Sequence, residues 1–346
     1  MKALILAGGK GTRLRPLTVY TPKPIVPVAN RPFLVYQIEI LAKAGIDDIV
    51  LSLSYQPDKI EQVLGDGAEL GVRLTYVTEP SPRGTGGAYR FAAGSDTEPF
   101  VVLNGDILTN VDIASLVDFH RSNLSEATLC LAQVEDPSSF GLVELDDENK
   151  VLRFLEKPTM SGPAIPAVNT INAGIYVLEP SVLELIPEGE NRSFEYDVFP
   201  KILEQDRAFF GYPLEESYWL DIGNPMNYLK ANLDLIDGRV EGFEIERSEI
   251  SEIATVADID KRSVIAGGCV VKPGVRIQRS VIGPGVHLEE RSTIEDSVIW
   301  AHTRVATAAE VKGSVIGKSC FIGRNSTVSS GSILGDKASI PDYSNI

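Results

Sequence analysis

Three glycines and two basic side chains near the start of the chain have the spacing of a phosphate-binding loop. Gly8, Gly9 and Gly11 directly follow an apolar run, and Arg13 and Lys23 come soon after them. Glycine lets the backbone approach a ligand closely, and successive backbone N–H groups form a concavity that binds anions. A guanidinium offers a phosphate a fork of donors, and an ammonium adds a point charge. The spacing fits neither a Walker loop nor a dinucleotide-binding fingerprint, so another kind of phosphate site is expected.

A second set of small and acidic residues follows at two later turns. Gly84 and Thr85 lie in a glycine-rich turn, which could be a ligand loop or a helix N-cap with flexible glycines. Asn104, Gly105 and Asp106 end a buried apolar strand. The Asp could cap the next helix, but at the carboxyl edge of a parallel sheet it is well placed to hold Mg²⁺, which we favour.

Alternating strands and helices must position these residues. We expect strands at 48–53, 72–77, 100–106 and 127–134, and helices at 32–44, 57–64, 89–93 and 113–121. This order is typical of βαβ units with a parallel sheet, in which ligands bind at the carboxyl ends of the strands.

The string GGKGTRLRPLTVYTPKP at residues 8–24 resembles the signature of the sugar-nucleotide pyrophosphorylases. These nucleotidyltransferases join a sugar 1-phosphate to a nucleoside triphosphate, which become the two expected substrates. The resemblance implies an α/β, Rossmann-like nucleotidyltransferase domain with a mixed central sheet. It also implies that the nucleotide contacts Leu6, Ala7, Gly8, Gly9, Gly11, Thr12, Arg13, Lys23, Gly84, Thr85, Asn104, Gly105 and Asp106.

Further motifs extend this resemblance to the sugar side of the site. On chemistry alone, Glu156 and Lys157 could form an exposed ion pair, but they stand in the family's Phe-x-Glu-Lys-Pro motif, which continues into Pro158. The family implies a sugar-phosphate site made by Gly141, Glu156, Lys157, Asn172, Ala173 and Gly174. The stretch 218–225 matches another family motif, in which Asp221 joins Asp106 on a catalytic Mg²⁺. Arg13, Lys23, Asp106 and Asp221 are thus the expected catalytic residues.

The end of the chain has a different period. A Ser followed by two aliphatic residues recurs at Ser263, Ser280, Ser297, Ser314 and Ser332, at separations of 17, 17, 17 and 18 residues. Apolar residues between these marks step by six, which predicts a left-handed parallel β-helix of hexapeptide type. Such coils are often acyltransferases, but only His287 and His302 could serve one here. We favour a role in assembly, with a homo-oligomer, a dimer or tetramer, as the expected state.

Length and composition bound the remaining possibilities. The 346 residues suffice for a nucleotidyltransferase domain at 1–237, a linker at 238–258 and a β-helix at 259–346. The net charge of −16 argues against nucleic acid as a partner. The first strand starts at once and no run reaches the roughly 18 apolar residues of a membrane span, so we expect a cytosolic protein without a membrane partner. The three cysteines are isolated in apolar runs and are interpreted as core residues.

Base and sugar specificity are open at this level. The Gly-Thr-Gly-Gly loop at 84–87, the run at 154–158 and the repeats together resemble the mannose-1-phosphate guanylyltransferases most. Heptose-1-phosphate guanylyltransferases and glucose-1-phosphate thymidylyl- or uridylyltransferases share several of the motifs. The family also contains regulatory relatives that only sense sugar nucleotides. Because the expected charged catalytic residues are all present, an enzyme is favoured over a sensor.

Overall fold

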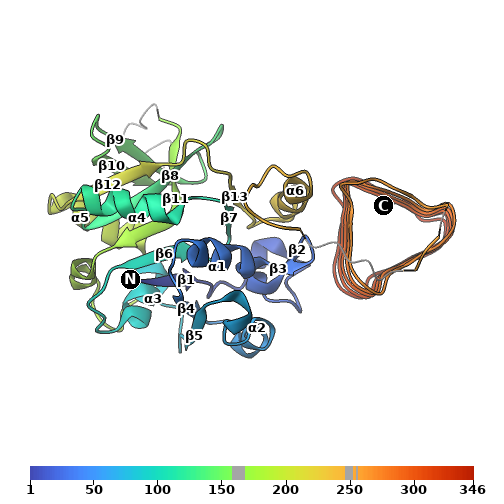
Figure 1. Cartoon of the computed structure of the whole chain (residues 1–346), viewed down its shortest axis with the longest axis horizontal. Coiled ribbons are helices and arrows are strands. Elements are labelled where there is room, and N and C mark those ends of the chain that lie inside the picture. The colour runs from blue at the N-terminus through green and yellow to red at the C-terminus, as the bar shows by residue number, and fades with distance from the viewer. Residues whose placement is uncertain (158–167, 246–251, 255) are drawn as a thin grey trace. The chain divides into compact units, whose positions relative to one another are not determined.

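The computed structural model describes residues 1–157, 168–245, 252–254 and 256–346. The chain forms two compact units (Figure 1). The first unit contains residues 1–9 and 34–219, and the second contains residues 10–33 and 220–346. The glycine-rich signature is therefore divided, because Gly8 and Gly9 belong to the first unit while Gly11, Arg13 and Lys23 belong to the second.

A mixed nine-stranded sheet forms the centre of the first unit. Its strand order is β10-β9-β11-β6-β1-β4-β5, and β8 joins β12 to β11. Neighbouring β1, β4, β5 and β6 run parallel, whereas β11 runs antiparallel to β6, β8 and β9. The bounds are β1 (Lys2–Leu6), β4 (Asp48–Leu53), β5 (Arg73–Thr78), β6 (Phe100–Asn104), β8 (Ala127–Gln133), β9 (Gly141–Leu145), β10 (Val151–Glu156), β11 (Thr170–Leu178) and β12 (Phe209–Pro213). The sheet confirms the expected α/β class with a mixed centre.

The helices of this unit follow the predicted order. They are α1 (Phe33–Lys43), whose first residue belongs to the second unit, α2 (Pro57–Leu64), α3 (Gly84–Ala93), α4 (Ile113–Ser122) and α5 (Phe199–Glu204). One prediction differs in its start. We expected the helical stretch at 89–93 to follow a glycine-rich turn, but α3 already begins at Gly84, so the glycines form its first turns.

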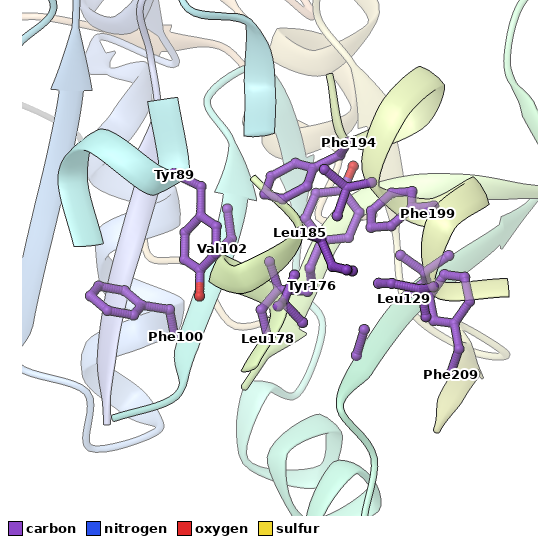
Figure 2. Close-up of a cluster of buried hydrophobic side chains, with 14 of the residues drawn as sticks. Tyr89, Phe100, Val102, Leu129, Tyr176, Leu178, Leu185, Phe194, Phe199 and Phe209 are labelled. Atoms are coloured by element: carbon purple, nitrogen blue, oxygen red, sulfur yellow. The ribbon is translucent and has the colours of Figure 1, made fainter. Parts of the chain in front are cut away.

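Aromatic side chains form a large part of the buried core of the first unit (Figure 2). Phe194 and Phe199 stack with ring centroids 5.4 Å apart and planes 8° apart. Tyr176 of β11 contacts both rings at 5.3 Å, and Tyr89 of α3 lies 5.7 Å from Phe194. Aromatic pairs at these separations add to the free energy of burial. The cluster therefore anchors α3, β11 and the π-helical turn at Phe194–Val198 to one another.

The second unit begins with two short turns and a hairpin. Two 3₁₀ turns, η1 (Thr12–Leu14) and η2 (Lys23–Ile25), precede β2 (Pro27–Val28) and β3 (Arg31–Pro32). Ala29 and Asn30 both have positive φ, as the tight turns between paired strands require. The second unit resumes at Leu220, inside β13 (Trp219–Asp221), and continues into α6 (Pro225–Ile236). The helix is capped at Asp237, and the following Gly238 has a φ of 76°.

The end of the chain is a three-sided parallel β-helix, whose coils Figure 1 shows end-on as a triangle. One side stacks β14 (Glu252–Ile253), β17 (Val270–Val271), β20 (His287–Leu288), β23 (Arg304–Val305), β26 (Phe321–Ile322) and β29 (Ser339–Ile340). The second stacks β15 (Asp258–Ile259), β18 (Arg276–Gln278), β21 (Thr293–Glu295), β24 (Glu310–Lys312) and β27 (Thr327–Val328). The third stacks β16 (Val264–Ile265), β19 (Val281–Ile282), β22 (Val298–Ile299), β25 (Val315–Ile316) and β28 (Ile333–Leu334).

The recurring serines bond adjacent coils to each other. The Oγ atom of Ser263 accepts from the backbone N–H of Ser280, and the same 3.1 Å bond recurs from Ser297 to Ser280 and from Ser314 to Ser297. The spacing grows by one residue at Ser332, whose backbone N–H donates to the Ser329 carbonyl at 3.1 Å. The predicted six-spaced aliphatics are buried inside the coils.

All three cysteines are buried, and none forms a disulfide. Burial raises the pKa of the Cys130 thiol and of the Cys320 thiol. Both findings agree with a packing role for these side chains.

Candidate active site

The first glycine loop follows strand β1 and lies close to two other segments, at Ser54 and at Glu79. The Ser54 hydroxyl donates to the Gly8 carbonyl. A Cβ atom on Gly8 would lie 3.1 Å from that hydroxyl and 3.3 Å from the Glu79 carboxylate, so a side chain would push both away. Glu79 is buried and accepts from the Ser52 hydroxyl at 2.9 Å and from the Arg83 N–H at 3.1 Å. This carboxylate therefore ties β4 to the residue before α3.

Gly105 brings the end of β6 against the end of β1. Its N–H donates to the Leu6 carbonyl at 2.9 Å, and a Cβ atom at this position would lie 2.8 Å from the same oxygen. Ala7 is buried beside it and donates to the Ser52 carbonyl at 2.9 Å. Asp106 thus follows a backbone that is bonded directly to the first loop, as expected for neighbouring parallel strands.

The glycines at the start of α3 allow close backbone packing. A Cβ atom on Gly84, where φ is 69°, would lie 2.5 Å from the Arg192 carbonyl, and one on Gly87 would lie 2.6 Å from the Glu190 carbonyl. The Gly87 N–H donates to the Arg192 carbonyl at 2.9 Å. These glycines are therefore needed for packing against the chain at 190–192, whatever they contribute to a ligand.

Thr85 connects α3 to a carboxylate that the sequence analysis did not select. Its hydroxyl donates to Glu195 at 2.9 Å and accepts from the Phe194 N–H at 2.8 Å. The Ser193 hydroxyl donates to the same carboxylate at 2.5 Å. Two hydroxyl donors and the stacked Phe194 therefore fix the position of Glu195.

A group of amide side chains lies where β6 meets β11. Gly174 has φ of 73°, and a Cβ atom there would lie 2.7 Å from the Asn104 amide nitrogen. Asn172 donates to the Tyr176 hydroxyl at 3.0 Å and accepts from the Gly174 N–H at 3.0 Å. The Asn104 side-chain oxygen is buried and has no hydrogen-bond partner among the described residues. It is an acceptor that a hydroxyl of a ligand would satisfy.

Gly141 makes room for the Glu156 carboxylate. The two residues are cross-strand partners on β9 and β10, and a Cβ atom on Gly141 would lie 2.6 Å from Glu156 Oε2. Lys157 Nζ lies 3.4 Å from Glu156 Oε1, and its side chain is 60% exposed whereas that of Glu156 is 11% exposed. Burial, and then the charge of Glu195, raise the pKa of Glu156 against the opposing effect of Lys157. Pro158, the last residue of the motif, lies outside the described residues.

In the second unit, Arg13 and Asp221 form an ion pair. Arg13 Nη2 lies 3.9 Å from Asp221 Oδ2, and the Gly223 N–H donates to Asp221 Oδ1 at 2.5 Å. The Asp221 backbone carbonyl accepts from the Asn227 side chain at 2.8 Å, which ties it to the first turn of α6. A Cβ atom on Gly223 would lie 2.8 Å from Arg13 Nη2. Glycine here lets the guanidinium and the carboxylate approach.

Lys23 packs against Gly11, in the part of the glycine-rich signature that belongs to the second unit. Its side chain is buried, and Gly11, with φ of 62°, sits so close that an added Cβ atom would be 3.0 Å from Lys23 Cβ. The Thr18 hydroxyl donates to the Gly11 carbonyl at 2.7 Å and closes the turn that contains Thr12. Lys23, Arg13 and Asp221, three of the four predicted catalytic residues, thus belong to one unit.

Comparisons with known proteins decide the family. Residues 2–238 match the family model described as nucleotidyl transferase, and residues 245–346 match the one described as the EIF2B subunit epsilon LbH domain. The chain belongs to the nucleotidyl transferase family. The chain is thus a nucleotidyltransferase enzyme with a left-handed β-helix, as predicted.

Relatives of this nucleotidyltransferase cover nearly the whole chain. It is 40% identical over 302 residues to a mannose-1-phosphate guanylyltransferase of Mycobacterium tuberculosis, covering 85% of this chain and 82% of that protein. It is 37% identical to a probable mannose-1-phosphate guanylyltransferase 1 of Oryza sativa, covering 91% and 90% of the two chains. A mannose-1-phosphate guanyltransferase of Pichia angusta is 35% identical, with 98% and 97% covered.

Nucleotidyltransferases of this family generally use a divalent metal ion. Asp106 belongs to the first unit and Asp221 to the second, and each offers carboxylate oxygens, the donors that hard divalent cations prefer. Within the described parts of the chain, no three His, Cys, Asp or Glu side chains gather as a metal-binding group. None of the helices described is long and apolar enough to cross a membrane.

Proposed function

We propose that this nucleotidyltransferase is a mannose-1-phosphate guanylyltransferase, which converts GTP and mannose 1-phosphate to GDP-mannose and pyrophosphate. The observation that carries the proposal is that relatives from a bacterium, a plant and a yeast are all named for this reaction. Proteins named for this reaction in a bacterium, a plant and a yeast match at 35–40% identity over most of the chain. The motif residues that the reaction needs are all present in the sequence.

The chemistry requires little beyond positioning and charge neutralisation. An oxygen of the sugar phosphate attacks the α-phosphorus of GTP, and the bond from that phosphorus to the bridging oxygen breaks as pyrophosphate leaves with the electron pair. Both reactants are anions, so holding them together and offsetting their charge lowers the barrier. We assign the triphosphate to Arg13 and Lys23, the sugar phosphate to Lys157, and sugar hydroxyls to Glu156.

Mg²⁺ is the proposed ion, held by Asp106 and Asp221, and it would supply further charge neutralisation at the phosphates. The residues Leu6 to Gly9, Gly11, Thr12, Gly84, Thr85 and Asn104 to Asp106 are proposed to line the nucleotide. Gly141 and Asn172 to Gly174 are proposed to line the sugar phosphate. The buried, unpartnered Asn104 oxygen supports a polar ligand near these residues.

The organisation of the chain is also part of the proposal. It comprises a catalytic domain at 1–237, a linker at 238–258 and a β-helix at 259–346 that assembles a dimer or tetramer. The linker lies partly outside the described residues. A cytosolic location completes the proposal, since both substrates are phosphorylated metabolites.

A release assay tests the function. Pyrophosphate is measured with each of four nucleoside triphosphates against mannose, glucose and heptose 1-phosphates. The proposal predicts the highest kcat/KM for GTP with mannose 1-phosphate. A higher value for thymidine or uridine triphosphate with glucose 1-phosphate, or for GTP with heptose 1-phosphate, would reassign the specificity. No release with any pair would support a non-catalytic sensor.

A further inference from the structure

One position breaks the repeat of the β-helix. The residue after the two aliphatics in successive coils is Ala266, Gly283, Trp300, Gly317 and Gly335. At two of these positions glycine avoids a close contact, since a Cβ atom on Gly283 would lie 2.8 Å from the backbone of the next coil and one on Gly317 would lie 2.7 Å from it. Trp300 is the exception in this column, and it is only 1% exposed. Its partners include a residue outside the coils.

Trp300 contacts α6 of the same unit. Its indole Nε1–H donates to the Tyr228 hydroxyl at 2.9 Å, and the two rings meet edge-on with centroids 6.2 Å apart. The Tyr228 hydroxyl in turn donates to the Pro27 carbonyl. A buried Trp and Tyr thus join the coil to the residue that begins β2, and their polar atoms are mutually satisfied.

A second branch reaches the other side of the same turn. Lys318, one coil further on, places Nζ 5.7 Å from the centroid of the Trp300 ring and 3.3 Å from the Thr21 hydroxyl. An ammonium within about 6 Å of an indole face is attracted to it. Thr21 and Pro27 flank the turn η2, which contains Lys23. The coil therefore holds both ends of the turn that carries this lysine.

Neighbouring contacts anchor the segment at further points. The Asn30 side chain donates to the Ile282 carbonyl at 3.0 Å, and the Ala29 N–H donates to the Asn232 side chain at 2.8 Å. Lys337 lies 5.8 Å from the centroid of the Tyr20 ring.

We infer that Trp300, Tyr228 and Lys318 are positioning residues for Lys23, so that the β-helix sets the geometry of triphosphate binding besides any role in assembly. The inference rests on the proposed function through the assignment of Lys23 to the triphosphate. The three residues do not themselves touch substrate. They act by fixing the backbone on both sides of η2, and a small displacement of a charged group at a reacting phosphate is costly.

The test combines hydrogen exchange with kinetics on the full chain. Trp300→Phe and Tyr228→Phe each remove the indole–hydroxyl link and keep an aromatic ring, and Lys318→Met removes the ammonium. Each should speed amide exchange in peptides covering residues 20–28 and raise the apparent KM for GTP about 3–10-fold, the usual effect of one such bond. The KM for mannose 1-phosphate should not change. Tyr228→Phe should have the larger effect, because it also removes the bond to the Pro27 carbonyl. The double variant should cost less than the sum of the two single variants, because both break the same indole–hydroxyl bond.

Lys312→Met is the matched control, since Lys312 lies on a coil and pairs with Glu310 at 2.9 Å. It should leave exchange at 20–28 and the KM for GTP unchanged. Unchanged exchange in all three test variants would overturn the inference. So would faster exchange with equal changes in both KM values, because the contacts would then serve stability alone. If the wild type turned over no substrate pair, the proposed function would fail, and exchange together with calorimetric GTP affinity would still decide the positioning role.

Discussion

Arg13 Nη2 lies 3.9 Å from the carboxylate of Asp221, so two residues 208 positions apart in the chain form an ion pair in one unit. The Arg13 side chain is 69% exposed and that of Asp221 is 17% exposed. The guanidinium is thus accessible to a phosphate, while the carboxylate is held by the Gly223 N–H. The pair places Arg13, assigned to the triphosphate, beside Asp221, assigned to the metal ion.

Asp221→Asn should reduce kcat far more than it weakens GTP binding. The change keeps the size of the side chain and the Gly223 bond but removes the charge proposed to hold Mg²⁺. A loss of transition-state stabilisation lowers kcat by about 10²–10³-fold. Steady-state kinetics and calorimetric GTP affinity measure the two effects. Wild-type turnover in this variant would remove Asp221 from the site.

Lys157→Ala and Arg13→Ala should separate the two substrates. Lys157→Ala removes the positive charge that is assigned to the sugar phosphate. The KM for mannose 1-phosphate should therefore rise, with little change in the KM for GTP. Losing Arg13 should mainly lower kcat, because charge at the triphosphate is no longer offset. Initial rates over a grid of both substrate concentrations give kcat and the two KM values of each variant. If both variants lost affinity for GTP alone, the assignment of Lys157 would be wrong.

Gly141→Ala should damage the sugar side of the site alone. The added methyl group would lie 2.6 Å from Glu156 Oε2 and 3.0 Å from the Phe154 ring, so the carboxylate must move. We expect kcat/KM for the sugar phosphate to fall by roughly 10–100-fold, with GTP affinity unchanged. Gly9→Ala is the comparison, since an added Cβ atom there has nothing within 4 Å, and it should leave the KM for the sugar phosphate unaltered. Equal effects of the two changes would contradict a pocket built around Glu156.

Asp237→Asn should destabilise the protein at neutral pH and lose that effect in acid. Asp237 accepts from Arg279 at 2.9 and 3.1 Å, and this hydrogen bonding lowers the pKa of Asp237 despite the opposing effect of its burial. A carboxyl with a lowered folded-state pKa stabilises the fold above its unfolded pKa, near 4, and this contribution fades as pH falls through the lower, folded-state value. The variant should lose roughly 1.5–3 kcal/mol at pH 7, measured by urea unfolding. A difference that stayed constant down to pH 3 would show that the charge is not its cause.

The fold was largely predictable because its signals are local or periodic. The strand at 48–53 and the helix at 57–64 were predicted with the bounds that the structure has, and the serine spacing predicted the coils. The start of α3 at Gly84 was not predicted, since the glycines at 84–87 pack against the chain at 190–192, about a hundred residues away. A lone sequence does not encode such a partner in its local pattern.

The same limit applies to the candidate site. The sequence assigned no role to Glu195, and only its hydrogen bond with Thr85 connects it to the predicted site. No sequence pattern pointed to the buried Glu79 either. Trp300 did leave a signal, because a tryptophan in a column of glycine and alanine is visible once the repeats are aligned. Its partner Tyr228, however, lies 72 positions earlier and could not be inferred.

Transfer of the α-phosphate is the most direct test of the central claim. GTP radiolabelled at its α-phosphate is incubated with the protein, mannose 1-phosphate and Mg²⁺, and the products are separated by chromatography. We expect label to move into GDP-mannose in step with pyrophosphate release, and chelation of the metal to stop both. Label that remained in GTP with mannose 1-phosphate, while glucose or heptose 1-phosphate accepted it, would contradict the assignment.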